Sequence, residues 1–86
     1  MMEEQFSQAT VRDHILAAAK LVAVKMFAGL DITKPVTLSG NEVFDVINNL
    51  LKENYKYSVS KYTFYFTVRK TMVNVAGDYG IELILS

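Results

Sequence analysis

Residues 41–72 contain two helical patterns joined by a short break, and this stretch constrains the fold more than any other part of the chain. Ser39 and Glu42 have the spacing of a capping box, in which a hydroxyl and an acid three residues later satisfy the first free N–H groups of a helix. Leu38 and Val43 have the spacing of the hydrophobic staple that accompanies such a box. We therefore expect the first of the two helices to begin directly after Ser39.

The break between the two helices, residues 54–58, has the sequence Asn-Tyr-Lys-Tyr-Ser and interrupts the apolar pattern. A second helix is expected after Ser60, because Val59 and Phe64 again have staple spacing. We expect this helix to end near Met72. Its inner face is predicted to consist of four residues at helical spacing: Phe64, Tyr65, Val68 and Met72.

The strongest apolar segment, residues 15–28, has 12 apolar residues among 14 and predicts a long N-terminal helix. Its cap is either Ser7 or Thr10, and Gly29 suits the left-handed position after its end. The segment is shorter than the roughly 20 residues that cross a bilayer, so we expect no membrane span. Because apolar residues occupy two sides of this helix, we expect a homodimer through one of them. The predicted dimer face comprises Ile15, Ala19, Val22 and Met26.

Two further segments predict β-structure. Pro35 excludes a helix at its own position, and the Val-Thr-Leu of residues 36–38 has strand propensity. Residues 73–76 alternate in polarity, residues 77–78 (Gly-Asp) have the composition of a two-residue turn, and residues 79–85 are consistent with a second strand. We therefore expect a hairpin in this part of the chain.

These elements predict a single, mainly helical α+β domain over residues 1–86, in the order α-β-α-α-β-β, with a flexible tail at residues 1–6. This is the order of a winged helix-turn-helix domain. Residues 59–70, Val-Ser-Lys-Tyr-Thr-Phe-Tyr-Phe-Thr-Val-Arg-Lys, resemble the recognition helix of small prokaryotic or phage winged helix-turn-helix regulators. The pattern of that helix is a capping Ser or Thr, a buried aromatic or aliphatic residue, and an Arg-Lys pair near the end. The resemblance implies transcription regulation, with this helix in the major groove of DNA and the turn at residues 77–78 as the wing.

The charge distribution limits how such DNA binding could work. Nine basic and nine acidic residues give a formal net charge of zero, so the chain lacks the global positive field of many nucleic-acid-binding proteins. Residues 52–72 nevertheless contain five cations and one acid, Glu53, for a local charge of +4 (five minus one). The cations are Lys52, Lys56, Lys61, Arg69 and Lys70. Binding to DNA would have to come from this local patch.

The alternative function is binding to a protein through exposed aromatic residues. Tyr62 and Phe66 are four residues apart on the expected outer face of the second helix, where they could anchor a partner. In size and in the absence of an enzymatic motif, the chain is similar to phage accessory proteins, such as the cytoplasmic antiholins that regulate lysis. The candidate residues for either kind of partner are Lys61, Tyr62, Thr63, Phe66, Arg69 and Lys70.

No residue pattern in the sequence indicates an enzyme. His14 is the only histidine and there is no cysteine, so neither a His-based metal cluster nor a thiolate site can form. The glycines make no phosphate-binding motif. We therefore expect no catalytic residues, no metal and no cofactor. The lack of cysteine favours a reducing compartment, and we expect the cytoplasm of a bacterium or of a phage-infected host.

Overall fold

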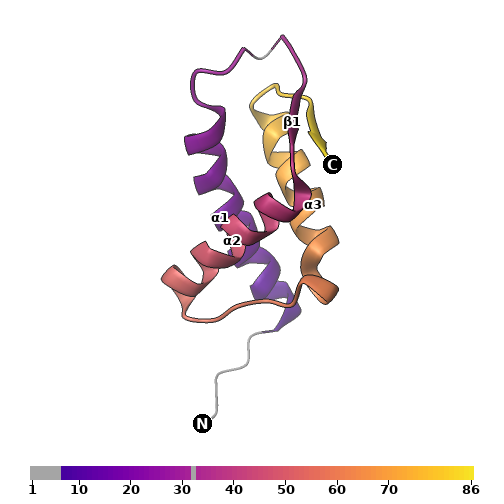
Figure 1. Ribbon diagram of the computed structural model, residues 1–86. Coiled ribbons are helices and arrows are strands. Elements are labelled where there is room, and N and C mark those ends of the chain that lie inside the picture. Colours follow the sequence, from indigo (N-terminus) through magenta and orange to yellow (C-terminus); the bar gives the residue numbers. More distant parts are fainter. Residues whose placement is uncertain (1–6, 32) are drawn as a thin grey trace.

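The computed structural model describes residues 7–31 and 33–86, and it shows a mainly helical α+β fold (Figure 1). The elements are α1 (Gln8–Phe27), β1 (Val36–Leu38), α2 (Gly40–Tyr55), α3 (Lys61–Asp78) and β2 (Leu83–Leu85). Helices α1 and α3 pack side by side, and α2 crosses next to both of them. The predicted flexible tail, residues 1–6, lies outside the described residues.

The two strands form a small parallel sheet. Val36 pairs with Leu83 and Leu38 pairs with Leu85, so β2 runs beside β1 in the same direction. Helices α2 and α3 form the connection between the two strands, as a parallel pair requires a long crossover. The predicted strand at residues 36–38 is confirmed.

The predicted hairpin is wrong in its first half, because residues 73–78 continue α3 instead of forming a strand. Val75 and Ala76 are buried and follow Val68 and Met72 at helical spacing, so they extend the buried side of the helix. The second predicted strand exists as β2, but its partner is β1. The observed order is therefore α-β-α-α-β, and the described residues contain no hairpin that could serve as a wing.

Helix α3 ends in a Schellman motif at Gly80. The Ile81 N–H donates to the Ala76 carbonyl over 2.9 Å, and the Gly80 N–H donates to the Gly77 carbonyl over 2.9 Å. Gly80 adopts a φ of 76°, in the left-handed region that favours glycine. Gly77, which was expected in a turn, lies inside the helix.

The predicted start of α2 is confirmed. The Ser39 Oγ accepts a hydrogen bond from the Glu42 N–H over 3.3 Å, and the Gly40 N–H donates to the Ser86 carbonyl over 3.0 Å. Both bonds satisfy N–H groups that have no partner within the helix. Of the two candidate caps of α1, Ser7 is the one used, since its Oγ accepts from the Thr10 N–H over 3.1 Å.

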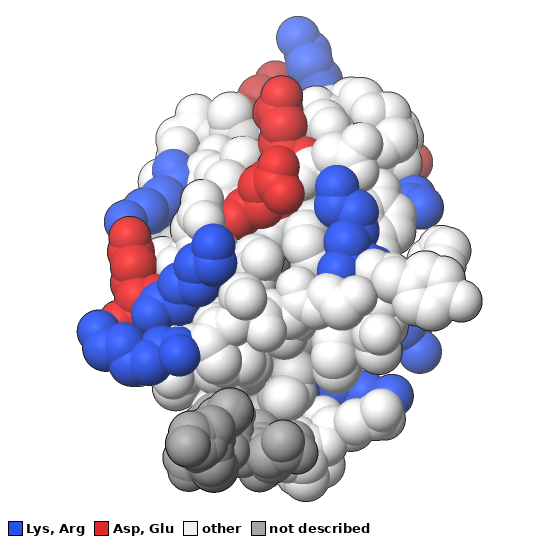
Figure 2. All heavy atoms as spheres, turned by 60° about the horizontal axis from the view of Figure 1, so that its bottom comes forward, with Lys and Arg blue, Asp and Glu red and all other residues white. Residues whose placement is uncertain are grey.

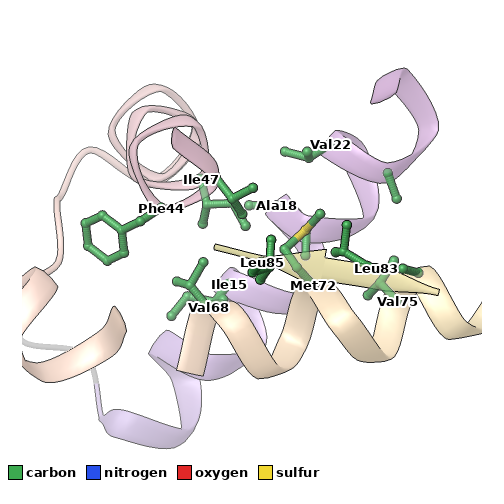
Figure 3. Close-up of a cluster of buried hydrophobic side chains, with 14 of the residues drawn as sticks. Ile15, Ala18, Val22, Phe44, Ile47, Val68, Met72, Val75, Leu83 and Leu85 are labelled. Carbon is green, nitrogen blue, oxygen red and sulfur yellow. The ribbon is translucent and has the colours of Figure 1, made fainter. Parts of the chain in front are cut away.

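One hydrophobic cluster joins all three helices and the sheet (Figure 3). Figure 3 shows side chains from four elements pointing toward one another between α1, α2, α3 and β2. The labelled residues are Ile15, Ala18 and Val22 of α1, Phe44 and Ile47 of α2, Val68, Met72 and Val75 of α3, and Leu83 and Leu85 of β2.

The predicted dimer face of α1 is not on the surface. Ile15 and Ala19 have no exposed area and Val22 is 3% exposed, because α2 and α3 cover this side of α1 within one chain. Only Met26 of the predicted face is exposed. The other exposed large apolar residues of α1 are Leu16, Leu21 and Val24, none of which belongs to the predicted dimer face.

Candidate interaction surface on α3

The outer side of α3 carries three exposed apolar residues, which we call the α3 stripe: Tyr62, Phe66 and Val73. Tyr62 is 97% exposed and Phe66 is 73% exposed, the two highest values among the large apolar residues of the described chain. Their spacing of four and seven residues places all three on the same side of the helix. Exposing large aromatic side chains to water is unfavourable, and a group of them on one side of a helix often marks a binding site. This side of α3 is therefore a candidate site for a partner.

Two shallow hollows flank Phe66. The first has a volume of about 410 Å³, and its lining is mainly apolar; it is lined by Phe66, Arg69, Lys70, Val73 and Asn74. The second has a volume of about 440 Å³ and is also mainly apolar; it is lined by Asn41, Lys61, Tyr62, Tyr65 and Phe66. Phe66 lines both hollows, so its side chain lies between them. Partner side chains could pack on either side of its ring.

Lys61 is bound to its own domain rather than directed freely to solvent. Its Nζ donates a hydrogen bond to the Asn41 Oδ1 over 3.3 Å and lies 5.7 Å from the centre of the Phe44 ring. These contacts tie the first turn of α3 to the first turn of α2. The Lys61 ammonium therefore contributes to helix packing as well as to the charge of the surface.

Arg69 is a structural tie between α3 and β2. Its Nη2 donates a hydrogen bond to the Leu85 carbonyl over 3.0 Å, and its Cζ lies 5.8 Å from the centre of the Tyr65 ring. The side chain is only partly exposed. A guanidinium that satisfies a backbone carbonyl of β2 has less freedom to bind a base edge or a phosphate.

The remaining predicted site residues are exposed but do not all share one position. Lys70 lines the same hollow as Phe66, whereas Thr63 lines neither of the two hollows beside Phe66. The structure therefore brings together Lys61, Tyr62 and Phe66 on one side and Phe66, Arg69 and Lys70 on the other.

Four residues that line the two hollows are not among the predicted site residues: Asn41, Tyr65, Val73 and Asn74. Val73 and Asn74 were assigned to a strand, although Val73 follows Phe66 at a spacing of seven residues, which is a helical signal. Asn41 comes from α2, and no spacing along the chain could connect it to Tyr62. Asn41, Val73 and Asn74 join the site because α3 is longer than predicted and because α2 packs against its first turn.

The cations do not form a continuous patch on the face shown in Figure 2. Lys and Arg side chains touch one another at the left of this view, next to Asp and Glu side chains, whereas the others are separated by neutral surface. The five cations of residues 52–72 belong to three segments: Lys52 to α2, Lys56 to the connection, and Lys61, Arg69 and Lys70 to α3. Of these cations, Lys61 and Arg69 also make hydrogen bonds within the domain, to Asn41 and to the Leu85 carbonyl.

A separate aromatic cluster surrounds His14. The His14 ring stacks on the Tyr55 ring with a centroid distance of 3.6 Å and an interplanar angle of 3°, and its Nδ1 lies 2.9 Å from the Tyr57 hydroxyl. Partial burial, followed by the nearby Tyr55 phenol, raises the pKa of Tyr57. The Tyr57 phenol therefore keeps its proton at neutral pH and is no candidate base. The cluster connects α1 to the end of α2 and to the segment after it.

The described residues contain no group of three or more metal-ligating side chains that could hold a metal ion. Among the helices described here, none combines the length and the apolar character needed to cross a membrane. No protein-family model, curated protein or solved structure matches this chain.

Proposed function

We propose that this chain is a small non-enzymatic module that binds a protein partner through the α3 stripe, with Phe66 as its central contact. The observation that carries the proposal is the exposure of Tyr62 and Phe66, 97% and 73%, beside two hollows that a partner could fill. Aromatic residues of this kind contribute most of the binding free energy in many interfaces, because a partner removes their large surface from water.

Such a module would act by occupying its partner, as an inhibitor or accessory factor does. The core explains why the stripe is available for this role. Val68 and Met72, on the opposite side of α3, are completely buried, so the fold does not need Tyr62 or Phe66 to complete its interior. The phage accessory proteins that the sequence resembles in size are one class in which this activity would fit.

Site-specific crosslinking tests the proposal in cells that express the protein naturally. A photoreactive phenylalanine analogue at position 62 should yield a discrete adduct with one partner, which mass spectrometry identifies. Phe66→Ala should reduce that adduct at least about tenfold, because loss of a hot-spot ring costs about 2 kcal/mol or more. Val46→Ala is the matched control, since Val46 is 42% exposed but lies on α2. An adduct that survives Phe66→Ala, or is lost equally in the control, contradicts the proposal.

DNA binding is the second candidate function. It is favoured by the order α2, connection, α3 and by the exposed positions of Lys61, Thr63 and Lys70 on the second of these helices. A winged helix-turn-helix complex would also use a hairpin wing, whereas residues 73–78 are helical, so DNA contact would depend on α3 alone. The net charge of zero and the bond between Arg69 and Leu85 place this candidate second.

Titration with duplex DNA at two salt concentrations separates the two functions. Phosphate contacts give an affinity that falls steeply as salt increases. Under the protein-binding proposal, we expect no binding to DNA that depends on Lys70. Steeply salt-dependent binding that Lys70→Ala weakens would instead favour the DNA-binding function.

A further inference from the structure

A more polar hollow lies on the side of α3 that faces α1. It has a volume of about 410 Å³ and is lined by Arg12 of α1 and by Thr67, Lys70, Thr71 and Asn74 of α3. The four residues of α3 recur at intervals of three and four, so they form one side of the helix. Unlike the hollows beside Phe66, this one has more polar than apolar lining. We call it the Arg12–Lys70 hollow.

The lining of this hollow suits an oxyanion. Two of its five residues are cations and none is an acid. Arg12 and Lys70 are both exposed, and neither side chain donates a hydrogen bond within residues 7–31 and 33–86, in contrast to Lys61 and Arg69. The hydroxyls of Thr67 and Thr71 and the amide of Asn74 add neutral donors. Charged and neutral donors together bind carboxylates by charge-assisted hydrogen bonds.

The Arg12–Lys70 hollow adjoins the apolar hollow beside Phe66. Lys70 and Asn74 line both, so the two hollows share a wall on α3. One side of this wall presents Phe66 and Val73, and the other presents Arg12 with the threonines. A ligand that spans both hollows would contact the apolar residues Phe66 and Val73 with one end and the cations Arg12 and Lys70 with the other.

We propose that the Arg12–Lys70 hollow is a carboxylate subsite of the interaction surface, so that the partner segment carries an Asp or Glu beside the apolar side chain that packs on Phe66 and Val73. This inference rests on the proposed function, since it specifies the chemistry of the protein partner. A protein carboxylate fits better than nucleic-acid phosphates, which repeat along a strand and need a row of cations. The hollow offers two cations next to an apolar wall.

Two matched peptides test the subsite by NMR titration of the isotope-labelled protein. N-acetyl-leucyl-aspartyl amide should bind about two- to tenfold more tightly than N-acetyl-leucyl-asparaginyl amide, as expected for one solvent-exposed carboxylate facing two cations. The aspartyl peptide should shift the amide signals of Thr71 and Asn74. Arg12→Gln and Lys70→Gln should each reduce this preference, whereas Lys25→Gln, which removes an exposed cation elsewhere on α1, should preserve it.

Charge reversal gives the sharpest form of the test. Lys70→Glu should reverse the preference, so that the variant binds N-acetyl-leucyl-lysyl amide more tightly than the aspartyl peptide. A titration with sodium acetate, compared with a titration with sodium chloride at equal ionic strength, tests carboxylate binding to the hollow in the absence of an apolar side chain. Shifts of Thr71 and Asn74 that acetate causes and Lys70→Gln abolishes support the subsite.

The outcomes separate the subsite from the proposed function. Equal affinities for the aspartyl and asparaginyl peptides, or no shifts with acetate and either peptide, overturn the carboxylate subsite but leave the crosslinking result at Phe66 intact. Conversely, a carboxylate preference that depends on Lys70 while Phe66→Ala has no effect on crosslinking supports the subsite and removes the protein-docking role of the stripe. Displacement of the aspartyl peptide by a short DNA duplex at physiological salt overturns the proposal in favour of nucleic-acid phosphate.

Discussion

Helices α2 and α3 are neighbours of similar length, 16 and 18 residues, but they use their surfaces differently. Helix α2 buries one side, which includes Phe44 and Ile47, and most of its other side is polar. Helix α3 buries Met72 in the same way, yet its opposite side exposes Tyr62 and Phe66. The comparison shows that α2 has the surface that folding requires, whereas α3 has additional apolar surface that folding leaves in water. That additional surface is where we place the partner.

The two helices also differ at their ends. The Ser39 side chain caps α2, whereas Ser60, at the same position before α3, makes no side-chain capping bond. Lys56, directly after α2, has a φ of 65°, and the left-handed residue after α3 is Gly80. These differences allow paired substitutions: the same change at the serine before each helix, and opposite changes at the left-handed residue after each helix.

The largest expected difference is between the two sides of α3. Met72→Ala should reduce the free energy of unfolding by about 2–5 kcal/mol, because it opens a cavity in the core where Met72 has no exposed area. Phe66→Ala should change it by less than about 0.5 kcal/mol, since Phe66 is 73% exposed and its ring, within the described residues, contacts just one other ring, that of Tyr65, edge-on. Urea denaturation followed by circular dichroism measures both. Similar losses in the two variants would mean that Phe66 is packed in the folded protein, and the comparison would fail.

A smaller effect is expected where each helix ends. Gly80→Ala should cost about 1–2 kcal/mol, because an L side chain is strained at a positive φ. Lys56→Gly should have the opposite sign and stabilise the domain by up to about 1 kcal/mol, since it relieves the same strain at the end of α2. Thermal unfolding of the two variants against the wild type checks the pair. A loss of stability in both would show that the left-handed conformations are not the controlling factor.

A smaller difference in stability is expected between substitutions at the serines that precede the two helices. Ser39→Ala is expected to cost about 1 kcal/mol, because the Glu42 N–H loses its acceptor at the first turn of α2. Ser60→Ala should cost less than about 0.5 kcal/mol, since the Ser60 hydroxyl makes no capping bond. Denaturant midpoints of the two variants measure the difference. Equal costs would indicate that Ser60 caps α3 in solution.

Tyr57, in the connection between α2 and α3, should make the free energy of unfolding decrease at alkaline pH. Burial, and secondarily the Tyr55 phenol, raises the pKa of Tyr57 above its usual 10.0. The folded state therefore holds this proton more tightly than the unfolded state, so the contribution to stability is complete below pH 10.0 and is lost as pH rises through the folded pKa. Unfolding free energies measured on both sides of this pH should show a smaller alkaline loss for Tyr57→Phe. The control Tyr62→Phe should keep the wild-type dependence.

Part of the candidate interaction surface could be predicted from residue order alone. Tyr62, Phe66 and Lys70 were expected on the outer side of the second helix, and the structure places them at exposed positions. The role of Arg69 could not be predicted, because its partner Leu85 belongs to β2 and comes close only when the chain folds. The approach of Arg12 to Lys70 depends in the same way on the packing of α1 against α3.

The sequence by itself determined where α2 begins and where β1 lies. Capping depends on hydrogen bonds between residues three apart, such as Ser39 and Glu42, and the limit set by Pro35 is equally local. Only the tertiary structure decided that residues 73–78 are helical and that Ile15 and Ala19 are interior. Four alternating residues fit a strand or a helix, and an apolar side of a helix fits a core or a partner. Such choices are made by the surfaces that pack against them, and these surfaces come from distant parts of the chain.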